Sequence, residues 1–195
     1  MRPPHHQMAD VERKSKHMKD DTWVIRWRDF LSDTYAYGSK IEFKDDLSVV
    51  YSNRLMPPGT VIHRWHSKTN FQAQRIEPTL PLIDGECAYA ISSDIAYNSP
   101  DSKELMLRIV FYDRYDVEAE SMIVRGGGTV FKPSIKTYSY CIELINGGNA
   151  DFTFKSLVLR EISKEEYDEQ QERIEKLKEG ASKGKKKRRK DKKSK

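Results

Sequence analysis

The sequence YSYCIELINGGNADFTFKSLVLREI, residues 138–162, decides the fold class of this 195-residue chain. Both of its ends are rich in aromatic and β-branched residues, which are typical of β-strands. Between them, Asn146-Gly147-Gly148-Asn149 has the residues of a turn. The segment therefore predicts two strands, Tyr138 to Ile145 and Phe152 to Ile162, joined as a β-hairpin.

The same alternation of short apolar runs and turn signals continues upstream. Leu105 to Tyr112 (LMLRIVFY) predicts a central strand that is buried on both faces, because its apolar run is nearly continuous. The other predicted strands are residues 23–27, 41–43, 47–51, 60–66, 86–95 and 119–124. Nine short strands without a helical period between them predict an all-β domain over residues 22–162, an antiparallel β-sandwich or jelly roll.

The two ends of the chain have a different composition. Residues 1–21 are polar, which predicts a disordered arm without an apolar secretion signal. Ser163 and Glu166 form a capping box that starts a charged helix, and Gly180 predicts its end. The apolar positions of this helix are Tyr167, Ile174 and Leu177. That stripe is thin, so the helix either frays or docks on a partner. A disordered Lys-rich tail is expected over residues 181–195.

Charge is concentrated in that tail. The chain carries +5, but residues 183–195 contain ten Lys or Arg and one Asp, so the remainder is mildly acidic at −4. The tail can attract anionic surfaces, and a weak contact with a membrane is expected, but no specific nucleic-acid recognition.

Cys87 and Cys141 lie in apolar strands and are expected to be buried, reduced thiols of a cytoplasmic protein.

No constellation of catalytic residues is recognisable in the sequence. Gly126-Gly127-Gly128 lacks the Lys-Ser/Thr of a phosphate loop and predicts a turn between two strands. His63 and His66 are three residues apart on a strand, which places them on opposite faces and disfavours a shared metal ion. A metal-dependent jelly-roll enzyme that uses these histidines is thus the least favoured alternative. We expect no enzymatic activity, no metal and no cofactor.

Recognition is the better interpretation of residues 55–82, LMPPGTVIHRWHSKTNFQAQRIEPTLPL. Pro57-Pro58-Gly59 sets a turn, residues 60–66 form a strand, and an amide-rich connection follows. Hydrogen-bonding side chains around Trp65 and Phe71 indicate a site for a polar ligand or a partner protein. Most aromatic side chains must be core, and an exposed minority would stack on sugar rings or anchor a partner.

Several of these segments resemble a known family. LMPPGTVIHRW, TNFQAQR and PTLPL within residues 55–82, the motif DTYAYGS at residues 33–39, and FTFKSLVLREI at the last strand are similar to the third accessory secretory proteins of the accessory Sec system. The resemblance covers roughly Trp23 to Ile162.

The resemblance implies a non-catalytic, cytoplasmic subunit whose β-sandwich resembles a carbohydrate-binding module. It implies a complex with the first and second accessory secretory proteins, which works with an accessory motor ATPase at the translocon. The implied substrate is a serine-rich-repeat glycoprotein adhesin that is glycosylated, O-acetylated and exported. A free-standing carbohydrate-binding module is the alternative.

The motif residues of the resemblance are the candidate binding residues, for a partner or a glycan. They are Tyr35, Tyr37, His63, Arg64, Trp65, Asn70, Phe71, Gln72 and Arg75. Sugar contact, partner contact and maintenance of the fold are all open roles for them. We expect Trp65 to be mostly core, and the side chains of Asn70, Phe71, Gln72 and Arg75 to order the connection and present a binding edge.

Overall fold

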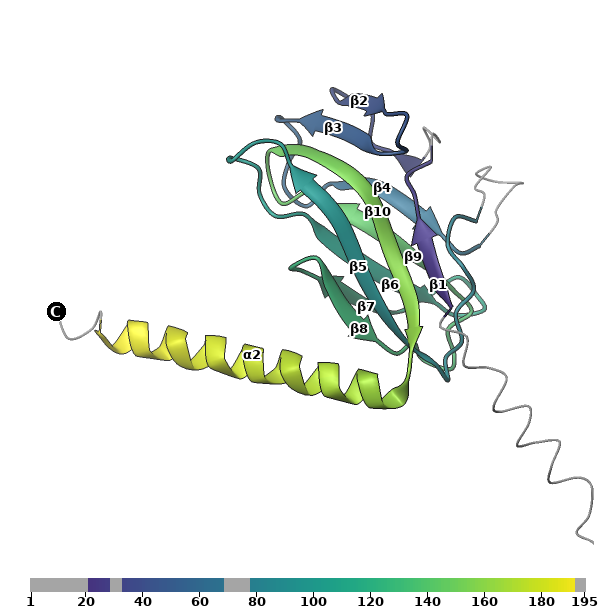
Figure 1. The fold of residues 1–195 in the computed structure, drawn as a ribbon, viewed down its shortest axis with the longest axis vertical. Coiled ribbons are helices and arrows are strands. Elements are labelled where there is room, and N and C mark those ends of the chain that lie inside the picture. Colours follow the sequence, from purple (N-terminus) through teal and green to yellow (C-terminus); the bar gives the residue numbers. More distant parts are fainter. Residues whose placement is uncertain (1–20, 29–32, 69–77, 192–195) are drawn as a thin grey trace, which may run out of the picture.

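The computed structural model describes residues 21–28, 33–68 and 78–191, which form ten strands and one long helix (Figure 1). The strands are β1 (Thr22–Ile25), β2 (Lys40–Phe43), β3 (Val49–Asn53), β4 (Val61–His66), β5 (Ala88–Tyr97), β6 (Met106–Tyr112), β7 (Glu118–Val124), β8 (Gly128–Phe131), β9 (Ser139–Ile145) and β10 (Ala150–Ile162). The helix is α2 (Lys164–Asp191). The nine predicted strands correspond to β1–β7, β9 and β10, with ends displaced by a few residues.

The strands form two antiparallel sheets that face each other, so the predicted sandwich is confirmed. Sheet A has the order β2-β3-β10-β5-β8, and β1 also pairs with β10; sheet B has the order β4-β9-β6-β7. Alternate side chains of each strand point into the space between the sheets and form the core. The largest fully buried side chains include Trp65, Tyr51, Tyr89, Phe152 and Phe154.

Strand β6 lies inside sheet B between β9 and β7, as its apolar sequence predicts. Its inward residues Leu107, Ile109 and Phe111 are buried. The outer face is only partly covered: Val110 is buried, but Arg108 is partly exposed. The prediction of burial on both faces is therefore wrong for part of the strand, because sheet B has one face open to solvent.

The predicted hairpin over residues 138–162 is wrong, because β9 and β10 belong to different sheets. The reason lies in the connection between them. Asn146 is fully buried, its N–H donates to the Thr60 carbonyl (2.9 Å), and its carbonyl accepts from the Gly59 N–H (2.8 Å). These contacts bind the connection to the start of β4. A Cβ at Gly147 would lie 2.0 Å from the Glu104 carbonyl oxygen, so the chain can pass there only as glycine.

Asn146 fixes this connection between β9 and β10 through its side chain as well as its backbone. Its Nδ2 donates to the carbonyls of Met56 (3.0 Å) and Pro57 (3.1 Å), and its Oδ1 accepts from Gly148 N–H (2.9 Å). The residue was predicted only as part of a turn.

Replacing this amide by a carboxyl group gives a test of that role. Asn146→Asp keeps the acceptor but turns the donor into an oxygen that faces two carbonyls. We expect a loss of about 3 kcal/mol in the free energy of unfolding at pH 7, since each unsatisfied buried group costs about 1–3 kcal/mol. The loss should shrink at low pH, where a protonated carboxyl can donate. Urea unfolding at both pH values measures this, and an unchanged midpoint would show that the connection does not depend on Asn146.

Strand β8 and the end of α2 differ from expectation. Gly126 and Gly127 have positive φ angles of 71° and 83° and turn the chain from β7 into β8, a strand of only four residues that the sequence does not signal. The helix runs through Gly180 to Asp191, so its predicted end is wrong and residues 181–191 are helical. A glycine inside a helix costs about 1 kcal/mol but does not stop it. The predicted arm, residues 1–20, and residues 192–195 lie outside the described residues.

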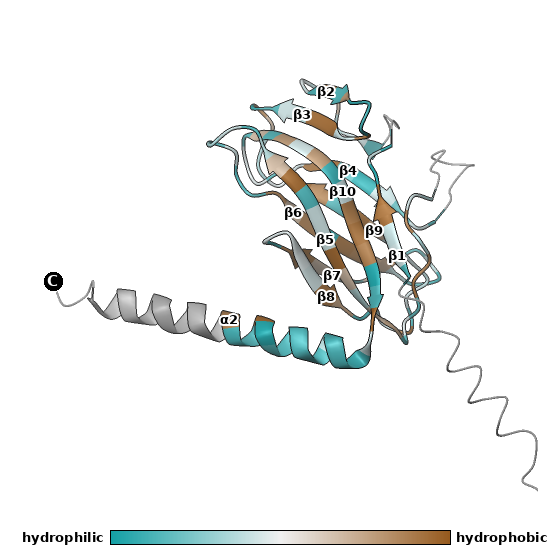
Figure 2. Ribbon diagram, viewed as in Figure 1, coloured by the Kyte–Doolittle hydropathy of each residue, from teal (hydrophilic) through white to brown (hydrophobic). Residues whose placement is uncertain are grey.

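The start of α2 is tied to sheet A. Glu166 N–H donates to the Ser163 hydroxyl (3.1 Å), as the capping box predicts. Tyr167 and Ile174 pack against a small cluster formed by Ala88, Val130 and Ile162. Elsewhere the first part of the helix is hydrophilic (Figure 2). Two residues of the thin apolar stripe therefore dock on the chain's own sheet, whereas the third, Leu177, is 74% exposed. Within the described ranges, no helix has the length and apolar character needed to cross a membrane.

Candidate functional site

The motif at residues 33–39 covers the open edge of β4. Tyr35 N–H donates to the Ile62 carbonyl (2.8 Å), and Thr34 forms an isolated bridge with His63. On the other end of β4, the N–H groups of Thr79 and Leu80 donate to the His66 carbonyl. Two of the segments that carry the family resemblance thus meet along one strand.

His63 lies inside this arrangement, with 2% of its surface exposed. Its Nδ1 is 2.7 Å from the Thr34 hydroxyl, and its ring stacks on Trp27 at 4.4 Å between centroids. Burial lowers the pKa of His63 to about 3. The imidazole is therefore neutral and serves as a hydrogen-bonding element of the core.

Trp65 is completely buried two residues further along β4. Its ring stacks on Phe154 at 5.3 Å, and its Nε1 donates to the Arg26 carbonyl (3.1 Å). The expectation that Trp65 is mostly core is confirmed. Both the His63 and the Trp65 ring point into the sandwich, so of the roles left open for these two motif residues their burial favours maintenance of the fold.

Arg64 points the other way, onto the outer face of sheet B. Its Nε donates to Glu143 Oε1 (2.8 Å), and Arg108 Nη1 donates to Glu143 Oε2 (3.4 Å). The strand register aligns Arg64, Glu143, Arg108 and Ile123 in one row across all four strands. The Arg64 side chain is 47% exposed, and Ile123 is 50% exposed. We call these four residues the outer row. Sequence reasoning missed Glu143, a charged residue within an apolar strand.

The two tyrosines of the first motif have different environments. Tyr35 packs against the core, and its carbonyl accepts from the Ser39 and Tyr51 hydroxyls (3.0 and 2.9 Å). Tyr37 has 85% of its surface exposed, although its carbonyl accepts from Asn53 Nδ2 (3.0 Å). Of the two, Tyr37 is much the more exposed to a ligand, because Tyr35 is partly buried.

His66 and the two cysteines are the other candidate groups that the sequence offers. His66 Nε2 lies 3.4 Å from Asp33 Oδ1, and burial lowers the pKa of His66 despite the opposing effect of that carboxylate. Among the described residues, no three His, Cys, Asp or Glu side chains are grouped to hold a metal ion. Cys141 is a buried free thiol as predicted, but Cys87 is only half-buried.

The structure does not describe the remaining predicted site residues. Asn70, Phe71, Gln72 and Arg75 lie outside the described residues, so their proposed binding edge stays a prediction.

Comparisons with known proteins point to one family. Residues 34–161 match the family model of the third accessory secretory protein (ASP) of the Accessory Sec secretory system. The protein of this name from Streptococcus gordonii is 34% identical over 132 residues, which cover 68% of this chain and 82% of that protein. Its namesake from Staphylococcus aureus is 25% identical over 151 residues, and the match spans 77% of this chain but only 46% of that relative.

Solved structures give the same result. A chain in the Glycosylation Associate Protein (Gap123) complex from Streptococcus agalactiae superposes with a TM-score of 0.66 at 34% identity, covering 73% of this chain and 45% of that one. A chain in the crystal structure of accessory secretory proteins 1, 2 and 3 from Streptococcus pneumoniae also gives 0.66, at 28% identity, covering 72% and 96%. The chain therefore belongs to the family of the third accessory secretory protein of the accessory Sec system.

Proposed function

We propose that this chain is a non-catalytic subunit that assembles with the first and second accessory secretory proteins. The observation that carries the proposal is the likeness, at 28% identity and a TM-score of 0.66, to a chain in a structure of accessory secretory proteins 1, 2 and 3. The geometry agrees with it, since His63 and Trp65 of the family motif are used to build the sandwich.

The outer row offers one surface for such an assembly. Glu143 holds Arg64 and Arg108 in place, and Ile123 adds an exposed apolar side chain at the end of the row. Arginine and apolar groups set among polar neighbours are typical of protein interfaces.

Co-purification tests the assembly. We expect the tagged chain to retain both partner proteins from a co-expressing cell, and deletion of residues 183–195 to leave this unchanged, because that segment lies outside the matched residues 34–161. Arg64→Ala should weaken retention several-fold, whereas Arg54→Ala, at another exposed arginine, should not. Failure to retain either partner would contradict the proposal, and failure only on truncation would place the tail in the interface.

We further propose that the assembly works in the cytoplasm, with the accessory motor ATPase, in the glycosylation, O-acetylation and export of serine-rich-repeat glycoprotein adhesins. The family's description as part of an accessory Sec system supports the link to export. A relative's name, Glycosylation Associate Protein, supports the link to glycosylation. The basic tail would add a weak contact with an anionic membrane.

Direct contact with the adhesin glycan is a second candidate function. The exposed Tyr37 ring favours it, because an accessible aromatic face can stack on a sugar ring. Calorimetric titration with an adhesin glycopeptide decides the matter. Binding that Tyr37→Ala abolishes would support it, and no binding by a chain that still retains its partners would exclude it.

A further inference from the structure

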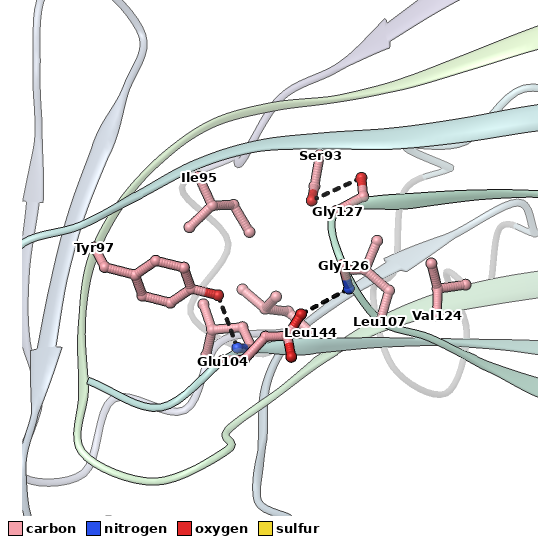
Figure 3. Close-up of a pocket in the computed structure, with 10 residues that line it drawn as sticks. Ser93, Ile95, Tyr97, Glu104, Leu107, Val124, Gly126, Gly127 and Leu144 are labelled. Carbon is pink, nitrogen blue, oxygen red and sulfur yellow. Dashed lines mark hydrogen bonds between the residues drawn. The ribbon is translucent and has the colours of Figure 1, made fainter. Parts of the chain in front are cut away.

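An apolar pocket opens between the two sheets where β8 begins. It has a volume of about 240 Å³ and is lined by residues from both sheets and by the β7–β8 turn (Figure 3). Ile95 of sheet A faces Leu107 and Leu144 of sheet B across it, and Val124 closes one side. A cavity of about 150 Å³ already admits benzene, so one large apolar side chain fits here. We call this pocket the edge slot.

Beside the edge slot, β5 has an unpaired backbone edge. Within the described residues, β8 pairs with β5 only from Tyr89 to Ser92, although β5 continues to Tyr97. Ser93 N–H donates toward β8, to the Gly127 carbonyl (2.7 Å), whereas Asn98 N–H donates toward β10, to the Asp151 carbonyl (3.0 Å).

The direction of the free backbone groups follows from this pattern. Successive residues of a strand direct their N–H and C=O groups to opposite sides. The backbone groups of Ile95 and Tyr97 therefore point to the same side as those of Ser93, beyond Gly128, the first residue of β8. They are an open template for another strand.

The rim of the edge slot is held in shape by two hydrogen bonds and carries one carboxylate, that of Glu104. Glu104 Oε1 accepts from Gly126 N–H (2.7 Å), and the Tyr97 hydroxyl accepts from Leu105 N–H (2.9 Å). Among the described residues that line the slot, Glu104 is the one charged residue, and it is exposed. The chain outside residues 183–195 is acidic as well, at −4. A basic residue next to the inserted side chain complements this rim.

We infer that the edge slot and the free edge of β5 receive an extended segment of a partner protein. The segment adds to sheet A as a strand beyond the first residue of β8. It places one aliphatic or aromatic side chain in the slot and an adjacent Lys or Arg near Glu104. Backbone hydrogen bonds supply affinity in this mode of recognition, and the pocket supplies specificity. The inference rests on the proposed function and names a surface, separate from the outer row, through which an accessory secretory protein is bound.

Hydrogen exchange of the backbone amides detects the added strand directly. With the purified first and second accessory secretory proteins, exchange in peptides covering residues 93–98 should slow by about tenfold or more. Peptides from β2, at the far edge of sheet A, are the internal control.

Val124→Phe fills the slot with apolar atoms and should abolish the protection, whereas Val124→Ala leaves the slot open and should retain it. Glu104→Gln keeps an acceptor for Gly126 and should weaken binding several-fold, unlike Asp101→Asn on the same loop.

Each failure has a different meaning. A complex that forms without protection of residues 93–98 overturns the strand addition and leaves the assembly standing. No complex at all overturns both. Protection in the isolated chain that disappears on deletion of residues 1–20 would assign the slot to the chain's own N-terminal segment, and protection that rises with protein concentration would assign it to a second copy. Both results contradict a partner strand.

Discussion

Trp65→Ala should lower the free energy of unfolding by about 3–5 kcal/mol, the range for removing a buried aromatic side chain. The indole is completely enclosed, stacks on Phe154 and donates to the Arg26 carbonyl. Its loss opens a cavity at the centre of the sandwich and leaves that carbonyl without its donor. Urea unfolding followed by circular dichroism measures the change.

Two further variants make this result specific. Trp65→Phe keeps most of the apolar volume and loses the hydrogen bond, so a smaller loss of about 1–2 kcal/mol is expected. Tyr37→Ala removes an exposed ring and should change stability by less than about 0.5 kcal/mol. A loss below about 1 kcal/mol for Trp65→Ala would contradict the placement of the ring in the core.

His63 should make the protein less stable in acid. Burial lowers its pKa to about 3 in the folded protein, whereas an unfolded histidine titrates near 6.5. Between these values the unfolded chain binds a proton that the folded chain does not, so the free energy of unfolding falls as the pH falls. This one group contributes a decrease of roughly 2–3 kcal/mol between pH 6 and pH 4.

His63→Asn removes the titrating group and keeps an amide near Thr34. The variant should be less stable at neutral pH, because it loses the stacking on Trp27, but its stability should change less between pH 6 and pH 4. His66→Asn should flatten the pH dependence less, since Asp33 opposes the effect of burial on the pKa of His66. Equal slopes for the wild type and His63→Asn would contradict the neutral, buried imidazole.

The strands were predictable because each is encoded locally. Alternating apolar residues and turn signals mark β1–β7, β9 and β10, and the aromatic residues indicated a core that includes Trp65. The pairing of strands depends on distant contacts. Asn146 bonds to Gly59 and Thr60, more than 80 residues earlier, and this contact separates β9 from β10.

The motif segments were recognisable in the sequence, but the direction in which each of their side chains points was not. Two of these segments meet along β4, but a single strand position cannot reveal which face it presents. His63 forms its hydrogen bond with Thr34 inside the protein. Glu143 and the edge slot gave no sequence signal, because they arise only when strands from distant parts of the chain lie together.

Assembly is the central claim, and the mass of the mixed proteins tests it most directly. The full chain and the purified first and second accessory secretory proteins are combined and analysed by size-exclusion chromatography with light scattering. We predict one peak that contains all three proteins, with a mass equal to a whole-number combination of theirs. A separate peak for this 22.8 kDa chain at its own mass, with the partners unchanged, would contradict the account.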